Sequence, residues 1–142
     1  MRSYGFEKLQ VWQDSKELSV LIYKVTAKFP TEEKFGLTSQ MRRAIVSVSS
    51  NIAEGSSRNT KKDQAYFYGV AYSSLVEVLS QTLIASELNF LEKNNVDEIR
   101  IEVEKVSNKL NALRKSVLNS WEYYVELLRC RVVEMIFDCP HS

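Results

Sequence analysis

Apolar residues return every three or four positions along most of this chain. Between residues 37 and 55 they lie four, four, three and four positions apart, at Leu37, Met41, Ile45, Val48 and Ile52. The same spacing continues through residues 6–29, 61–88 and 96–117. Because an α-helix has 3.6 residues per turn, positions at this spacing share one face of a helix. The pattern therefore predicts four amphipathic helices.

Residues that begin or end helices separate these four segments. Pro30 restricts the backbone of the residue before it and ends the first helix. Gly55 is predicted as a left-handed C-cap of the second helix. Thr60 and Asn95, each with an acidic residue three positions later, are predicted as N-caps of the third and fourth. Since short connections make consecutive helices antiparallel, residues 1–118 are expected to form an all-α, up-down-up-down four-helix bundle.

Residues 119–142 continue the helical spacing beyond the fourth segment. Their apolar positions are Trp121, Tyr124, Val125, Leu128, Val132, Met135 and Ile136. Interspersed charges, such as Glu126 and Arg129, exclude a membrane span. We therefore expect the fourth helix to extend into a C-terminal helix or tail, which packs on its own bundle or on another subunit. A helix that lies on a membrane surface or binds a partner is the alternative.

Composition and motifs point away from catalysis. The 142 residues are 44% apolar and 26% charged, as in an ordinary globular domain. The single histidine, His141, and both cysteines, Cys130 and Cys139, lie in the tail, without the spacing of a zinc or di-iron site. We expect no enzyme activity, no cofactor, no metal and no small-molecule substrate. Charged and aromatic residues follow Met1 where a leader would be apolar, so we expect a cytoplasmic protein.

The expected topology sorts the charges by end, although the net charge is only +1. One end combines the start of the first helix, the connection between the second and third, and the end of the fourth. Its basic residues are Arg2, Lys8, Arg58, Lys61, Lys62, Lys109, Arg114 and Lys115, against Glu7, Glu54 and Asp63. We call this end the basic rim, and its candidate nucleic-acid contacts are Lys8, Arg58, Lys61, Lys62, Arg114 and Lys115. Alternatively, such charges only complement helix dipoles.

A row of polar residues borders the apolar stripe of the second helix: Gln40, Arg43, Ser47, Asn51 and Glu54. A buried arginine must be paired, because breaking a buried ion pair costs about 3–5 kcal/mol. Glu77 lies among apolar residues of the antiparallel third helix and is the predicted partner of Arg43. We expect these two residues, with Asn51 and Glu54, to form a buried or interfacial network that fixes helix register or subunit contacts. The outward side of the helix, with Val46, is expected to be covered by a partner.

Three stretches carry a resemblance to a known family: FEKLQVWQDSKELSVLIYKVT at 6–26, FPTEEKFGLTSQMRRAIVSVSSNIAEGSSR at 29–58, and SSLVEVLSQTLIA at 73–85. Together they make residues 4–117 resemble the bacterial four-helix-bundle proteins encoded in intervening sequences of 23S ribosomal RNA genes. The accessory protein of diversity-generating retroelements is similar in fold. The resemblance implies a ring-shaped homo-oligomer, typically a pentamer, with a role in binding nucleic acid and no catalytic activity. The tail departs from the pattern.

Two hypotheses about function follow. In the first, a non-catalytic ring, expected to be a pentamer, binds the phosphates of RNA or DNA along its basic rim. Its binding would weaken as salt rises, because neutralised phosphates release counterions. In the second, the protein is an assembly or adaptor module that binds another protein and no nucleic acid. Reversing the charges of Lys61 and Lys62 would abolish binding in the first case and leave partner binding intact in the second.

Overall fold

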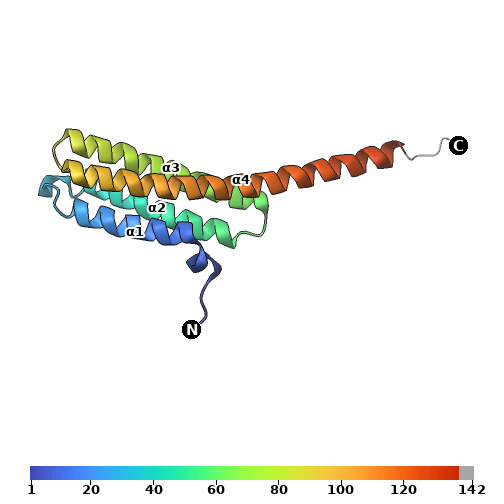
Figure 1. The fold of residues 1–142 in the computed structure, drawn as a ribbon, viewed down its shortest axis with the longest axis horizontal. Coiled ribbons are helices and arrows are strands. Elements are labelled where there is room, and N and C mark those ends of the chain that lie inside the picture. Colours follow the sequence, from blue (N-terminus) through green and yellow to red (C-terminus); the bar gives the residue numbers. More distant parts are fainter. Residues whose placement is uncertain (138–142) are drawn as a thin grey trace.

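The computed structural model describes the backbone of residues 1–137 and the side chains of residues 1–120, 125, 128 and 129. Its elements in order are η1 (Gly5–Lys8), α1 (Gln10–Thr26), η2 (Thr31–Glu33), α2 (Leu37–Ser57), α3 (Lys61–Glu87) and α4 (Lys93–Phe137). The described residues form helices and no strands, which confirms the all-α fold class. Figure 1 shows α1 to α4 lying along a common axis.

Each long helix packs against the next one along the chain, and α4 also packs against α1. The contacts between α2 and α3 show their relative direction. Ser47 of α2 meets Ser74 of α3, whereas Gly55, later in α2, packs close to Tyr68, earlier in α3. This reversed order means that α2 and α3 are antiparallel, and Figure 1 shows the same alternation for the other helices.

The core takes its side chains from rows at helical spacing. Met41, Ile45, Val48 and Ile52 of α2 are fully buried, and Leu37 is half-buried. The buried residues of α3 and α4 include Tyr68, Ala71, Leu75, Val78, Thr82, Ala85, Val96, Ile99, Val103, Val106, Leu110 and Val117. Full burial of each large aliphatic side chain contributes about 1.5–3 kcal/mol. The apolar stripes predicted from the sequence therefore face one common core, as expected.

Gly55 does not cap α2, contrary to the prediction. The helix continues to Ser57, and none of the described glycines has a positive φ. A Cβ atom placed on Gly55 would lie 2.7 Å from Cε1 of Tyr68 in α3. The glycine is therefore required for the close approach of two helices rather than for a left-handed turn.

Of the two predicted N-caps, the one for α3 is confirmed and the one for α4 is wrong. Thr60 caps α3 as predicted, and its side chain accepts a hydrogen bond from the backbone N–H of Asp63 at 3.2 Å. The prediction for α4 was wrong, because that helix starts at Lys93 and Asn95 lies inside it. The preceding turn depends instead on Asn89, whose φ is 60°. Asparagine tolerates this left-handed conformation better than most residues.

α4 is longer than the bundle that it completes. It has 45 residues, about 67 Å at 1.5 Å per residue, whereas the 27 residues of α3 span about 40 Å. Its C-terminal part projects beyond the end of the bundle where the chain begins (Figure 1), which confirms the expected extension of the fourth helix. Side chains at five of the predicted apolar positions lie outside the described ones: Trp121, Tyr124, Val132, Met135 and Ile136. Throughout residues 1–137, no helix is both long enough and apolar enough to cross a bilayer.

Candidate nucleic-acid interface

The basic rim lies at the end of the bundle where the chain begins and α2 leads into α3 (Figure 1). Lys8 ends η1, which contacts α2, and Arg58 directly follows α2. Lys61 and Lys62 begin α3, and Lys115 lies on α4 as that helix leaves the bundle. These five side chains are exposed. The fold therefore leaves five of the six candidate contacts open to solvent at or near one end.

Lys61 and Lys62 are the best placed of these residues to contact phosphate. They are the first two residues of α3, where backbone N–H groups lack intrahelical acceptors and the helix dipole is positive. Neither lysine forms an ion pair with a described residue. Asp63 in the same turn offsets part of the positive charge. The start of α3 still presents two free ammonium groups to solvent.

Arg58 is less available than these two lysines. Its guanidinium pairs with the carboxylate of Glu54, one turn earlier. The same guanidinium lies 4.6 Å from the ring centroid of Phe67, and the Arg58 carbonyl accepts a hydrogen bond from Nε2 of Gln64 at 2.9 Å. Because Glu54 neutralises much of its charge, Arg58 contributes less to the rim than its sequence position suggested.

Arg114 packs along α3 rather than standing free at the rim. Its guanidinium carbon lies 5.7 Å from the ring centroid of Tyr72, and a Cβ placed on Gly69 would lie 3.6 Å from its Nη2. The side chain is half-buried, and its Nε atom makes no hydrogen bond with a described residue. Cation–π attraction and packing of the alkyl chain thus assign Arg114 mainly to the contact between α3 and α4.

One aromatic ring of α3 is free beside the basic residues. Tyr66 is 65% exposed, and its ring meets that of Phe67 edge to face at 5.2 Å. Tyr68 is buried, and Phe67 and Tyr72 are half-buried, so these rings belong mainly to the core. Exposed aromatic rings next to basic groups are where unpaired bases stack. Tyr66 is therefore the aromatic candidate that the structure leaves accessible.

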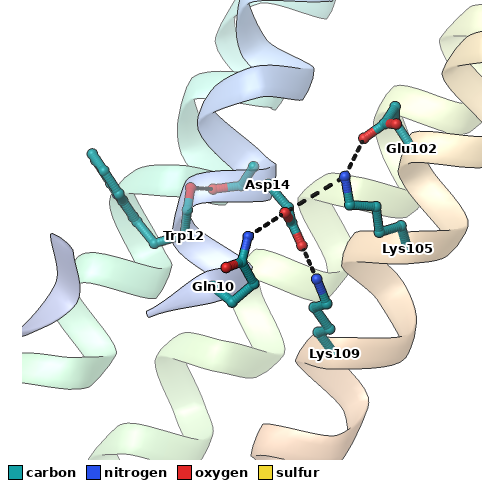
Figure 2. A network of polar contacts seen from close by, with 7 residues as sticks. Gln10, Trp12, Asp14, Glu102, Lys105 and Lys109 are labelled. Carbon is teal, nitrogen blue, oxygen red and sulfur yellow. Dashed lines mark hydrogen bonds and ion pairs between the residues drawn. The ribbon is translucent and has the colours of Figure 1, made fainter. Parts of the chain in front are cut away.

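Lys109 is not part of a free basic surface, because it pairs with a buried aspartate that the sequence analysis missed. Asp14 of α1 is only 1% exposed and accepts hydrogen bonds from Lys109 and, at 2.9 Å, from Gln10 (Figure 2). Lys105 lies 3.5 Å from the same carboxylate and 3.2 Å from Glu102. This group ties α1 to α4. One signal was available: Asp14 falls in the apolar row of the first helix, where a charge is rare unless paired.

The pKa of Asp14 lies below its ordinary value. Burial by itself raises this pKa, because it disfavours the charged form. The hydrogen bonds from Lys109 and Gln10 and the positive charges of Lys105 and Lys109 outweigh that effect. Asp14 is therefore held as a carboxylate, and its role is structural.

The polar row of α2 does not form the predicted network within one chain. Asn51 donates hydrogen bonds to the carbonyl of Ser47 at 2.8 Å and to its Oγ at 3.0 Å, and Ser47 lies 2.9 Å from the hydroxyl of Ser74. Arg43 and Glu77, in contrast, are exposed and form no ion pair with a described residue.

The periodicity of α2 explains why Arg43 is exposed. It lies two residues from both Met41 and Ile45, so it is about 200° around the helix from each of these core positions. Gln40 and Glu54 of the same row are exposed as well. The network inside the protomer is thus limited to serine and asparagine, and the interfacial form of the prediction stays a prediction.

Arg43 belongs to an outward groove on α2. We call this groove the α2 face; its lining includes Tyr23, Lys34, Phe35, Arg42, Arg43, Val46 and Ser50. Phe35 is 88% exposed. Arg42 donates a hydrogen bond from Nε to Oγ1 of Thr26 at 2.9 Å and lies 4.6 Å over the ring of Tyr23. The α2 face therefore combines exposed apolar groups with positive charge.

A second outward surface lies on α3 and has the opposite charge. We call it the α3 face; its lining includes Val76, Leu83, Ile84, Glu87 and Leu88, and exposed Glu77 follows Val76 directly on the same helix. All six side chains are exposed, and Ile84 and Leu88 are each 50% exposed. The α3 face therefore combines exposed apolar groups with negative charge.

The histidine, cysteine and acidic residues of the chain are its candidate metal ligands. His141 and Cys139 lie outside them, as does the side chain of Cys130. Within the described part of the chain, no group of three or more His, Cys, Asp or Glu residues could hold a metal ion. The expected lack of a cofactor stays a prediction.

The fold and the motifs in α1 to α3 agree with one family of bundle proteins. The family model described as 23S rRNA-intervening sequence protein matches residues 7–112. The chain belongs to this family. No curated protein matches the chain.

A solved structure shares the fold of this chain. It is the crystal structure of a protein of unknown function from the S23 ribosomal protein family of Bacteroides thetaiotaomicron. The two chains are 19% identical, with a TM-score of 0.69 over 74% of this chain and 95% of the other. The family match ends at residue 112. The projecting part of α4 therefore lies beyond the matched region.

Proposed function

We propose that this protein is a non-catalytic ring of identical subunits, expected to be five, which binds RNA or DNA through its basic rim. The observation that carries the proposal is the start of α3. There Lys61 and Lys62 are exposed without ion-pair partners among the described residues, at a positive helix end. Tyr66 adds an exposed ring one turn later. Phosphate contacts of this kind give affinity with little sequence readout.

The charges of the α2 and α3 faces support assembly into a ring. Arg42 and Arg43 make the first face positive, and Glu77 and Glu87 make the second negative. Because these are different surfaces of one chain, a contact between them is heterologous and generates a ring when its rotation closes. Arg43 of one subunit would then pair with Glu77 of the next, as an interfacial form of the predicted network.

A ring also explains how a nearly neutral chain could hold a polyanion. The net charge of one chain is +1, which gives little long-range attraction. In a ring the subunits all point the same way, so their α3 starts lie on one side. The free lysines of every copy can then contact phosphates of the same nucleic acid, and several weak contacts together raise the overall affinity.

The test is a binding titration of labelled structured RNA and duplex DNA at several salt concentrations. Lys61→Glu with Lys62→Glu is expected to abolish measurable binding. The control is Lys24→Glu with Lys28→Glu, which reverses the charges of two exposed lysines, one in the last turn of α1 and one just after that helix, at the opposite end of the bundle. This control changes the net charge equally and is expected to bind better than the rim variant. The milder double variant Lys61→Gln with Lys62→Gln removes two phosphate contacts per engaged subunit, which flattens the slope of log K against log salt by about 1.8 per engaged subunit for DNA and about 1.4 for a single strand. Equal binding by the two charge-reversal variants would contradict the proposal.

The second candidate function is an assembly or adaptor module that binds another protein. The exposed apolar residues of the α3 face, Val76, Leu83 and Ile84, favour this alternative. Under this alternative, Lys61→Glu with Lys62→Glu leaves partner binding intact. The nucleic-acid titration therefore separates the two functions.

A further inference from the structure

The part of α4 beyond Val117 lies outside the bundle. Val117 is the last buried residue of α4 among the described side chains, and Leu118, Asn119 and Ser120 are exposed. The helix continues to Phe137, about 30 Å further, and Figure 1 shows no other element alongside it. Most helical stability in proteins comes from packing of an amphipathic face, so this part needs a partner to be stable.

The sequence of the projecting part has a heptad repeat. Leu118, Trp121, Val125, Leu128, Val132 and Met135 follow at spacings of three, four, three, four and three. Alternating spacings of three and four are the a/d pattern of a coiled coil, with Leu118, Val125 and Val132 at a positions. Leu118 and Leu128 are 40% and 44% exposed in the single chain. Val125 is half-buried, so two of the three described side chains of this apolar row are exposed.

We infer that residues 118–136 of two copies of this chain pair as an antiparallel, two-stranded coiled coil. In such a pair each a position faces a d position of the other copy. The facing pairs are Leu118 with Met135, Trp121 with Val132, and Val125 with Leu128. We call the row of facing a and d residues the seam. Every pair in it is apolar, and the contact is self-complementary, as a two-fold interface requires.

Charged residues beside the seam favour antiparallel over parallel pairing of the two helices. Glu122 and Arg129 both occupy e positions, which face each other in an antiparallel pair. Each Glu122 therefore lies opposite Arg129 of the second copy, twice per pair. In a parallel pair, g positions would face e positions of the next heptad. Those pairs would be Val117 with Glu122, Tyr124 with Arg129, and Arg131 with Ile136, none of which joins opposite charges.

This contact is independent of the proposed ring. The ring contact joins unlike faces of the bundle, whereas the coiled coil joins like segments outside it. Because α4 leaves the bundle at the end that carries the basic rim (Figure 1), pairing turns the rims of two copies toward each other. The coiled coil therefore links two protomers or two rings across a two-fold axis.

The first test measures the mass of the full chain by light scattering. Val125→Asp places a charge in the seam and is expected to halve the mass. Ser120→Asp adds the same charge on the same helix outside the seam, and should leave the mass unchanged. If Arg43→Glu opens the ring, that variant should still form dimers through α4, so failure of the ring is distinguishable from failure of the coiled coil. An unchanged mass for Val125→Asp would overturn the inference.

The second test addresses the direction of pairing. Arg129→Glu places like charges opposite each other and is expected to weaken pairing at least about ten-fold, a difference of 1.4 kcal/mol. Combining it with Glu122→Arg restores opposite charges and should restore the mass. Absence of this rescue would overturn the antiparallel assignment.

Disulfide trapping gives a third, independent readout of the same geometry. In a chain with Cys130→Ser and Cys139→Ser, one batch carries Val125→Cys and another carries Leu128→Cys. After mixing and oxidation, the antiparallel pair predicts disulfides mainly between unlike batches. Disulfides mainly between like batches would indicate parallel pairing and refute the inference.

Discussion

Replacing Asp14 with asparagine tests the polar contact that ties α1 to α4. The carboxylate accepts hydrogen bonds from Lys109 and Gln10, with Lys105 3.5 Å away (Figure 2). Asparagine has nearly the same size and keeps one side-chain acceptor, but it removes the negative charge. The change therefore isolates electrostatics from packing.

The expected destabilisation is about 2 kcal/mol, within the range for hydrogen bonds that involve charged groups. Removing one partner of a fully buried ion pair costs more, about 3–5 kcal/mol, because the remaining charge is stranded. Here the side chains of Lys105 and Lys109 are 38% and 40% exposed and can regain water. For a chain of this length the loss corresponds to a fall of about 6 °C in Tm.

The same contact predicts how stability depends on pH. The pKa of Asp14 is lowered in the folded protein, so the folded state binds its proton less readily than the unfolded chain. Its contribution is fully present above the unfolded pKa of about 3.9 and is lost as pH falls through the folded value. The difference in stability between the wild type and Asp14→Asn should therefore shrink below about pH 4.

Urea unfolding at pH 7, 5 and 3 and at fixed protein concentration measures both effects. Glu104→Gln is the matched control, because Glu104 is exposed on α4 and forms no ion pair with a described residue. It should change stability by less than about 0.5 kcal/mol. An Asp14→Asn variant as stable as the wild type at pH 7, or a difference that grows toward pH 3, would refute the reasoning.

Two further predictions concern the packing of α2. Gly55→Ala should destabilise the fold by about 1–3 kcal/mol, because its Cβ would lie 2.7 Å from the Tyr68 ring, whereas Gly5→Ala, with nothing within 4 Å, should be nearly neutral in the same urea titration. Arg43→Glu should lower the mass of the assembly measured by light scattering, and adding Glu77→Arg should restore it. A double variant no larger than the single one would show that these residues do not face each other across the subunit contact.

The helices could be predicted from the sequence because their signal is local. The apolar rows of α2, α3 and α4 repeat every three or four residues, and any helix with such a row must bury it. Thr60 was also predictable, since an N-cap acts on residues within its own first turn. Gly55 was misassigned because its role depends on the close approach of Tyr68 from another helix. Asn95 was misassigned because residue propensity is a weak signal, and α4 starts two residues earlier.

Which basic residues of the rim are exposed was only partly predictable, because some of them have partners far away in the sequence. Exposure of Lys61 and Lys62 follows from their place at a helix start, which the sequence indicates. The partners of Lys109 and Arg114 lie on other helices, and Asp14 is 95 residues from Lys109 in the chain. Pairings over such distances depend on which faces of the helices meet.

The sequence by itself thus determined that the chain forms four long helices, which sides of them are apolar, and where most of the charges lie. Only the tertiary structure decided which cations are free, that Asp14 of α1 pairs with Lys109 of α4, and how far α4 extends beyond the bundle. The physical reason is the range of the interactions. Periodicity and capping act within one or two turns, whereas burial and ion pairing are fixed only when separate helices pack together.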